Sequence, residues 1–187
     1  MSRMYYVLFV GSGHESEVES CIDRYVPAEA CERHFVPRRC LRRKLRGQWV
    51  DYQERLIPGY VFVQSGDIEL LSRSLRDVPA YTRILGAEAS EGETRFYPLN
   101  EDEAAWLRKL MGAGGEEEML DAVPLSQVGF DEKDRAVILS GPLRGMEGSV
   151  IKLNLHRRIA EVEVELMGRK TILHLGIDLL KSADKES

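Results

Sequence analysis

The segment PRRCLRRKLRGQW, residues 37–49, concentrates side chains that could bind an anionic partner. Positions 38–46 hold five arginines and one lysine, and no acid interrupts the run between Arg33 and Val50. Folding gains little from such a cluster, because like charges at neighbouring positions repel. The cations can coat a solvated surface, or they can contact phosphates and guanine edges of a nucleic acid, for which arginine is well shaped. The candidate contacts are Arg38, Arg39, Arg42, Arg43, Lys44, Arg46, Gln48 and Trp49.

The composition places this cluster in an acidic globular protein. The 187 residues carry a formal net charge of −5, with 43% hydrophobic and 30% charged residues. No window approaches the roughly 18 uncharged apolar residues of a membrane span. The early apolar run Tyr5–Val10 is too short for a signal-peptide core. We therefore expect a cytoplasmic, monomeric protein with no membrane partner.

Neither a metal site nor an active site is indicated. The cysteines Cys21, Cys31 and Cys40 form no CxxC pair and the four histidines are scattered, so we expect reduced thiols and no metal. The segment VGSGHES, residues 10–16, lacks the third glycine of GxGxxG and the GKS or GKT of a phosphate loop. No acid, base and nucleophile form a recognisable constellation. The expectation is a non-enzymatic function without catalytic residues or cofactors.

Two domains joined by a linker are predicted. Residues 111–124, MGAGGEEEMLDAVP, have the glycine- and glutamate-rich composition of a flexible connection. We expect a first domain over 1–112, a linker over 113–123 and a second domain over 124–187. Residues 1–112 have 16 basic and 17 acidic side chains, a net −1, and residues 113–187 have 10 and 14, a net −4. The basic run is therefore a local feature.

The first domain alternates strand and helix patterns. Strand patterns cover 5–10, 34–37, 58–64 and 82–86, and helix patterns start near 15, 67 and 100. The dipeptide Arg46-Gly47 and the alternating QWVDYQ after it predict a basic β-hairpin, and a short helix pairing Leu41 with Leu45 is the alternative. In RLIPGYVFV, residues 55–63, Tyr60 and Phe62 fall on one strand face, either in the core or as an anchor for a partner.

The second domain has strand patterns alone. DRAVILSG, GSVIKLN, AEVEVELMG and KTILHLG are four short strands separated by turns. In AEVEVEL we expect Val162, Val164 and Leu166 to point inward and the intervening glutamates outward. Short strands at this spacing predict a small barrel.

Four stretches resemble the NusG family of transcription elongation factors: YYVL, FVPR, IPGYVFV and V-x-LSGPLRGMEGSV. They follow the family order over essentially the whole chain. The first domain is similar to the family's N-terminal (NGN) domain and the second to its KOW domain. The resemblance implies an α+β fold, in which a mainly antiparallel sheet flanked by helices carries a basic hairpin and is joined to an SH3-like barrel. The KOW-motif residues would be Gly141, Pro142, Gly145 and Gly148.

The resemblance also implies partners. The NGN domain of the family binds the clamp helices of the largest RNA polymerase subunit through an apolar, aromatic pocket. Tyr5 and Ile57 stand here where Trp and Phe are frequent, and both keep the apolar character. The KOW domain contacts ribosomal protein S10 and, in some members, Rho, and Met167 would make that contact in place of an aromatic residue. The pocket carried over by motif is Tyr5, Tyr6, Ile57, Pro58, Gly59, Tyr60, Phe62, Ile84 and Leu85.

Within this family the basic run is most similar to the LoaP-type antiterminators, whose NGN domain recognises a hairpin in the leader transcript. That resemblance implies antitermination at selected operons, with the cations on RNA, and nonspecific contact with upstream DNA is the alternative. Two other functions stay open. One is a general NusG-type elongation factor without an RNA target, and the other is a stand-alone RNA-binding KOW protein.

Overall fold

The computed structural model describes residues 4–112 and 120–180, so most of the predicted linker lies outside the described residues. The chain divides into two compact units. Unit 1 joins residues 1–37 to 57–104, and unit 2 joins residues 38–56 to 105–187. The basic segment therefore belongs to the unit that contains the second domain. None of the helices in the described ranges has the length and apolarity needed to span a bilayer.

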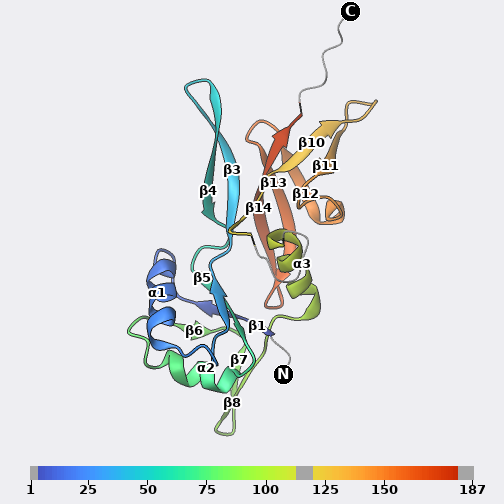
Figure 1. Cartoon of the computed structure of the whole chain (residues 1–187). Helices are drawn as coiled ribbons and strands as arrows, with labels where there is room; N and C mark the ends of the chain where they lie inside the picture. Colours follow the sequence, from blue (N-terminus) through green and yellow to red (C-terminus); the bar gives the residue numbers. More distant parts are fainter. Residues whose placement is uncertain (1–3, 113–119, 181–187) are drawn as a thin grey trace, which may run out of the picture. The chain divides into compact units, whose positions relative to one another are not determined.

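Unit 1 is built on a four-stranded antiparallel sheet in the order β2-β5-β1-β6. Its strands are β1 (Met4–Phe9), β2 (Arg33–Phe35), β5 (Tyr60–Ser65) and β6 (Arg83–Ile84). Helices α1 (Glu15–Tyr25) and α2 (Ile68–Leu75) cover one face of the sheet (Figure 1). The predicted strands and helices of this region are confirmed, and the strand that follows Pro58-Gly59 lies inside the sheet.

The core of unit 1 lies between the sheet and these two helices. Strand alternation sends Tyr6, Leu8 and Val10 toward the helices. Asp67 caps α2 by accepting a hydrogen bond from the Leu70 backbone N–H at 2.9 Å, which orients the apolar face of that helix. The remaining members of the buried cluster include Val18, Ile22, Val36, Val61, Val63, Leu71, Leu75, Val78 and Ile84.

A buried carboxylate joins two loops of unit 1. Glu15 is fully buried, and its Oε1 accepts a hydrogen bond from the Gly59 N–H at 2.6 Å. Its Oε2 accepts one from the Gly13 N–H at 2.8 Å. Gly59 has φ +91°, and a Cβ there would lie 3.3 Å from the Ser12 nitrogen. The carboxylate therefore holds the Pro58-Gly59 turn in a conformation that glycine adopts at low cost.

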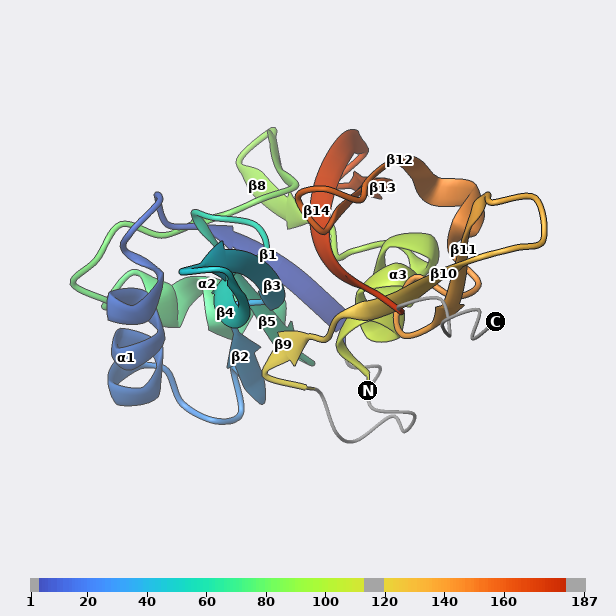
Figure 2. The ribbon, with the colours of Figure 1, turned by 90° about the horizontal axis from the view of Figure 1, so that it is seen from above.

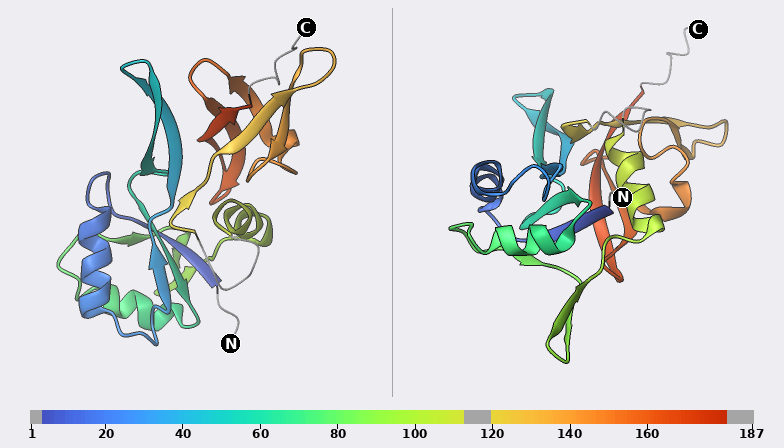
Figure 3. Two further views of the ribbon diagram at one scale, coloured as in Figure 1. Left: turned by 45° about the horizontal axis from the view of Figure 1, so that its top comes forward. Right: turned by 60° about the horizontal axis from the view of Figure 1, so that its bottom comes forward.

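Unit 1 also contains a small hairpin that the strand patterns did not predict. Strands β7 (Ala87–Ser90) and β8 (Glu93–Phe96) are joined by Glu91-Gly92, both with positive φ, and project from the sheet (Figure 3, right). All of β7 and most of β8 are exposed. Helix α3 (Glu101–Met111) follows, and its start is a capping box in which Asn100 and Glu103 exchange side-chain to backbone hydrogen bonds.

The second domain forms a five-stranded sheet in the order β11-β10-β14-β13-β12 (Figure 2). Its strands are β10 (Ser126–Phe130), β11 (Ala136–Ser140), β12 (Val150–Asn154), β13 (Ile159–Leu166) and β14 (Arg169–Leu179). The four predicted strands are confirmed, and β10 is additional. Val162, Val164 and Leu166 are buried as predicted. Trp106 of α3 donates its indole N–H to the Glu165 carbonyl oxygen at 2.8 Å.

The basic segment is a β-hairpin, and the alternative helix is wrong. Strand β3 (Arg38–Leu45) pairs antiparallel with β4 (Gln48–Arg55) over eight residue pairs. The turn is Arg46-Gly47, with φ of 50° and 83°, the left-handed pair of a type I′ turn. The short strand β9 (Ala122–Val123) lies parallel to the start of β3. Figure 3 (left) shows the hairpin as a long ribbon.

Replacing Glu15 with Gln should destabilise the protein by about 1–3 kcal/mol, because an amide NH₂ would then face one of two buried N–H donors. The measurement is a urea titration followed by circular dichroism, in which the midpoint should fall with little change in slope. The matched control is Glu17→Gln on the exposed side of α1. Equal midpoints for the two variants would contradict a structural role for the carboxylate.

Cys31 should resist alkylation in the folded protein. Burial raises the pKa of its thiol to about 11, although the backbone of Arg33 lowers it in part. Relative to an ordinary thiol with a pKa of 9.0, about 100-fold less thiolate is present near pH 8. Iodoacetamide labelling read by mass spectrometry should modify Cys21 well before Cys31, and urea should remove the difference. Equal rates in the folded state would contradict the burial.

Candidate functional site

The two faces of the β3–β4 hairpin carry different side chains. Residues directly opposite each other share a face, so Arg42, Lys44 and Trp49 lie on one side with Asp51. Arg43 lies on the other side, opposite Val50. The hairpin thus brings together all eight residues predicted to contact nucleic acid, but it distributes them over both faces and the turn.

Two of the arginines are held by acids and carbonyl groups of unit 2. Arg42 Nε donates to Asp51 Oδ1 at 2.5 Å, and its Nη1 forms an ion pair with Asp178 of β14. The hydrogen bond that Arg42 donates to Asp51 and its contact with Asp178 raise the pKa of Arg42. Arg39 donates to the His174 carbonyl oxygen at 2.7 Å and to Glu54 at 3.2 Å. Both side chains therefore have structural partners.

Four further cations of the hairpin are exposed. Arg38, Arg43, Lys44 and Arg46 form no ion pair within the described residues. Arg43 lies over the ring of Tyr52, with 5.0 Å between the guanidinium carbon and the ring centroid. This contact orients the side chain without neutralising its charge. The outer hairpin is therefore a cationic surface available to an anionic ligand.

Trp49 is placed beside this surface rather than in a core. Its ring is 36% exposed and lies under Arg158, whose guanidinium carbon is 4.8 Å from the ring centroid. Gln48 is exposed at the first position of β4. An aromatic ring and an amide next to free cations can add stacking and hydrogen bonding to phosphate contacts.

A cluster of aromatic rings lies on the face of the unit 1 sheet opposite α1 and α2. Tyr60 pairs with Phe9, and Phe62 pairs with Val7 and Phe35 of the flanking strands, so these side chains share a face. Phe62 is buried and stacks on Phe35 at 5.6 Å. Tyr60 is half-buried. The rings of Tyr60 and of Tyr81, which is 64% exposed, both contact Phe9 edge-on.

The structure separates two residues from the pocket predicted by motif. Tyr6 and Ile84 belong to the core beneath the helices, because neighbouring residues of a strand point to opposite faces. Burial raises the pKa of the Tyr6 hydroxyl. Tyr5 and Leu85 are half-buried and alternate with them, so they face the aromatic cluster. The motif comparison missed Phe9, which the period of two in β1 places on this face. It also missed Phe35 of β2 and Tyr81 before β6, which are found only from the ring contacts in the structure.

The remaining pocket residues form the entry to β5. Gly59 is fixed by the Glu15 carboxylate, and its carbonyl accepts a hydrogen bond from the Val10 N–H at 2.9 Å. Ile57 is buried and Pro58 is exposed. This turn therefore positions the aromatic face and presents a proline at its edge.

The KOW-motif residues form the connection between β11 and β12. Gly141 has φ +93°, and a Cβ there would meet Ser126 and the Leu125 carbonyl oxygen, so this glycine allows a close backbone approach. The Leu143 N–H donates to Ser126 Oγ at 3.0 Å, which fixes the loop. Pro142, Gly145 and Gly148 complete the turn, although Gly148 has open space around it. Met167 and Gly168, with φ of 50° and 72°, form the β13–β14 turn.

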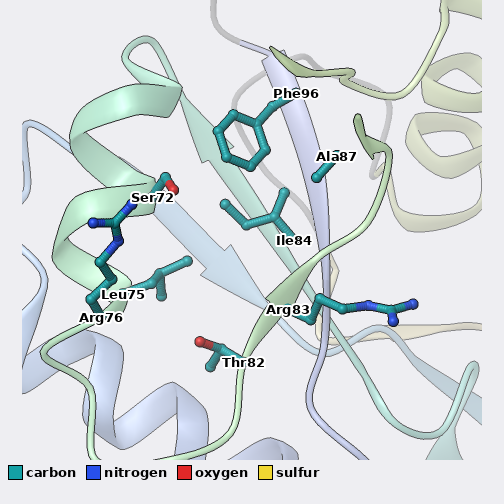
Figure 4. Close-up of a pocket in the computed structure, with 8 residues that line it drawn as sticks. All are labelled: Ser72, Leu75, Arg76, Thr82, Arg83, Ile84, Ala87 and Phe96. Atoms are coloured by element: carbon teal, nitrogen blue, oxygen red, sulfur yellow. The ribbon is translucent and has the colours of Figure 1, made fainter. Parts of the chain in front are cut away.

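A hollow of about 260 Å³ lies at the edge of α2 and β6. Leu75 and Ile84 form its apolar part, and Figure 4 shows the guanidinium groups of Arg76 and Arg83 pointing in different directions. The two cations therefore do not converge on one ligand. Within the described ranges, no three His, Cys, Asp or Glu side chains are grouped to hold a metal ion.

Comparisons with known proteins agree with this architecture. A family model described as transcription termination factor nusG matches residues 3–108. The transcription termination/antitermination protein NusG of Thermus thermophilus is 32% identical over 128 residues, covering 66% of this chain and 65% of that protein. The protein of the same name from Pseudomonas aeruginosa is 25% identical over 180 residues, covering 94% of this chain and 96% of that one.

A solved structure shares the fold. It is titled "Domain interaction in Thermotoga maritima NusG" and matches with a TM-score of 0.53 and 24% identity over 94% of each chain. The order of elements, an antiparallel sheet under two helices followed by a β-rich barrel, is the same as in the expected NGN and KOW domains. The chain therefore belongs to the NusG family of transcription factors, which are not enzymes.

Proposed function

We propose that this protein is an operon-targeted transcription antitermination and elongation factor that binds the RNA polymerase clamp helices and a leader RNA hairpin. NusG-family proteins act on the transcription machinery, so the polymerase is the expected partner of the first domain. The observation that supports the RNA part is the set of exposed cations on the outer hairpin, which have no ion pair among the described residues of a chain with net charge −5.

The distribution of charge on the hairpin fits binding to structured RNA better than a role in solubility alone. Surface cations that only keep a protein soluble are usually interspersed with acids. Here the acids of β4 and β14 pair with Arg39 and Arg42, whereas Lys44 and Arg46 have no ion-pair partner in the part of the chain that the structure describes. Exposed Trp49 offers a stacking surface for an unpaired base of an RNA loop. Such contacts would give both affinity and a choice of leader.

The aromatic face of unit 1 suits the clamp helices. Tyr5, Phe9 and Tyr60 lie half-buried on a rigid sheet, and exposed Tyr81 contacts the same cluster. Large rings on rigid elements bind with a low entropy cost and dominate protein interfaces. A polymerase contact here and an RNA contact on the hairpin would raise the effective concentration of each.

The second domain would couple transcription to ribosomal protein S10 or to Rho. Met167 lies in a two-residue hairpin turn and is half-buried, so its flexible side chain can fill a partner's apolar pocket. This contact would leave the aromatic face and the basic hairpin unchanged.

Replacing Tyr60 with Asp should abolish polymerase binding, because a carboxylate would be desolvated against the apolar partner. The measurement is co-purification of the full-length variant with bacterial core polymerase, or surface plasmon resonance. Tyr25→Asp, at the exposed end of α1, is the matched control and should bind normally. Normal polymerase binding by the Tyr60 variant would contradict the proposal that the aromatic face binds the polymerase.

The operon-targeted role is tested by single-round transcription through an intrinsic terminator, on templates with the natural leader of the target operon or a scrambled leader. Readthrough should rise only with the natural leader. The double variant Lys44→Ala, Arg46→Ala should lose most of this effect, because each lost phosphate contact weakens binding. Lys133→Ala on the barrel is the control. Equal readthrough on both templates would indicate a general elongation factor instead.

A further inference from the structure

We propose that the turn between β12 and β13, residues 155–158, is a second part of the RNA-binding surface, contributed by the KOW barrel. The inference rests on the proposed role of the hairpin and extends it to a segment that the sequence patterns did not single out. The turn reads Leu-His-Arg-Arg, and it lies beside the hairpin through the contact between Arg158 and Trp49.

Arg158 is the residue that joins the turn to the hairpin. Its guanidinium carbon lies 4.8 Å from the Trp49 ring centroid, and its Nη1 donates to the Leu155 carbonyl oxygen at 3.3 Å. Its backbone has φ 59°, and its carbonyl accepts a hydrogen bond from the Ile177 N–H of β14 at 3.0 Å. The turn is therefore anchored to the barrel on one side and to the hairpin ring on the other.

The two neighbouring side chains of the turn are exposed to solvent. His156 and Arg157 are exposed and form no ion pair in the described part of the chain. The Arg157 N–H donates to Asn154 Oδ1 at 2.9 Å, so the backbone of the turn is held while the side chain stays in solvent. A guanidinium on a fixed backbone loses little entropy when it binds a phosphate.

Strand β14 keeps the hairpin and the turn together. Three successive contacts run from β3 to β14: Arg39 to the His174 carbonyl, Cys40 to Gly176, and Arg42 to Asp178. Gly176 is essential to the second, because a side chain there would overlap the Cys40 carbonyl oxygen. The contact is therefore a close backbone approach and needs this residue type.

The ion pairs of Arg42 neutralise two carboxylates near the hairpin. Asp51 and Asp178 are both paired with Arg42. Lys44, Arg46 and Arg157 form no ion pair of their own among the described residues, so their charges remain for a ligand. The ligand that fits two cationic segments flanking an aromatic ring is a folded RNA, whose backbone presents phosphates to both and whose loop base can stack.

The test uses full-length protein and, as probe, the leader RNA that supports readthrough in the transcription assay. Arg157→Ala should weaken binding roughly three- to tenfold and reduce the slope of log affinity against log salt by about 0.7 to 0.9. Lys44→Ala is the hairpin variant for comparison. The matched control is Arg169→Ala, an exposed cation at the first position of β14 and opposite the far end of β13, which should bind as the parent does.

The outcomes separate this inference from the proposed function. If Lys44→Ala weakens binding and Arg157→Ala does not, the hairpin binds RNA alone and the barrel turn has no role. If neither variant changes affinity or salt dependence, the RNA-binding function of the hairpin is itself wrong. Loss in the Arg169 control as well would show nonspecific attraction to any barrel cation and would overturn the inference.

A second variant tests whether docking is required. Gly176→Val should separate β14 from β3 and weaken RNA binding as much as Arg157→Ala does, with no further loss when the two are combined. In a Trp106→Phe background, acrylamide should quench the remaining Trp49 emission more strongly after Gly176→Val. Additive losses, or unchanged quenching with unchanged affinity, would contradict a docked composite surface.

Discussion

The buried Glu15 carboxylate is the interaction on which the geometry of unit 1 depends. It accepts hydrogen bonds from Gly13 and Gly59, and so it ties the start of α1 to the turn that leads into β5. With Gly59 held in its left-handed conformation, Tyr60 is placed opposite Phe9. A slip of one residue would exchange every side chain of β5 between the helix face and the aromatic face. One carboxylate therefore sets which residues a partner of that face would meet.

The β3–β4 hairpin carries many positive charges on two paired strands, and these charges repel one another. Acids enter only on β4 and on β14, where they meet Arg39 and Arg42 near the base of the ribbon. Arg43 is accommodated by the ring of Tyr52 rather than by a carboxylate. Repulsion is thus relieved where the ribbon packs and retained where it faces solvent. This division distinguishes the structural arginines from those that can bind a ligand.

Local patterns predicted much of this fold. The period of two in β13 and the Arg46-Gly47 turn followed from side-chain alternation and turn chemistry, and both are confirmed. The β7–β8 hairpin was missed because its strands are almost wholly polar and exposed, although the Glu91-Gly92 turn carried a signal. Strand β10, SQVGF, shows no clear alternation of apolar and polar residues. It is stabilised by pairing with β11 on one side and β14 on the other.

The candidate site was predictable in composition but not in arrangement. The cationic run is visible in the sequence, whereas the ion pair between Arg42 and Asp178 joins residues too far apart for any local pattern. The placement of Tyr6 and Ile84 in the core follows from sheet register, which depends on strand pairing. The role of Gly176 required knowing which carbonyl group approaches it.

The short strand β9 lowers the entropy cost of bringing the hairpin and the barrel together. It pairs with the first residues of β3 and is followed after only Pro124-Leu125 by β10, the first strand of the barrel. The barrel is thus tethered at the root of the hairpin, and the loop that must close is very short. Because closure entropy grows with loop length, this tether makes re-docking after separation nearly a local event. The β9 pairing therefore keeps the root of the hairpin close to the first strand of the barrel.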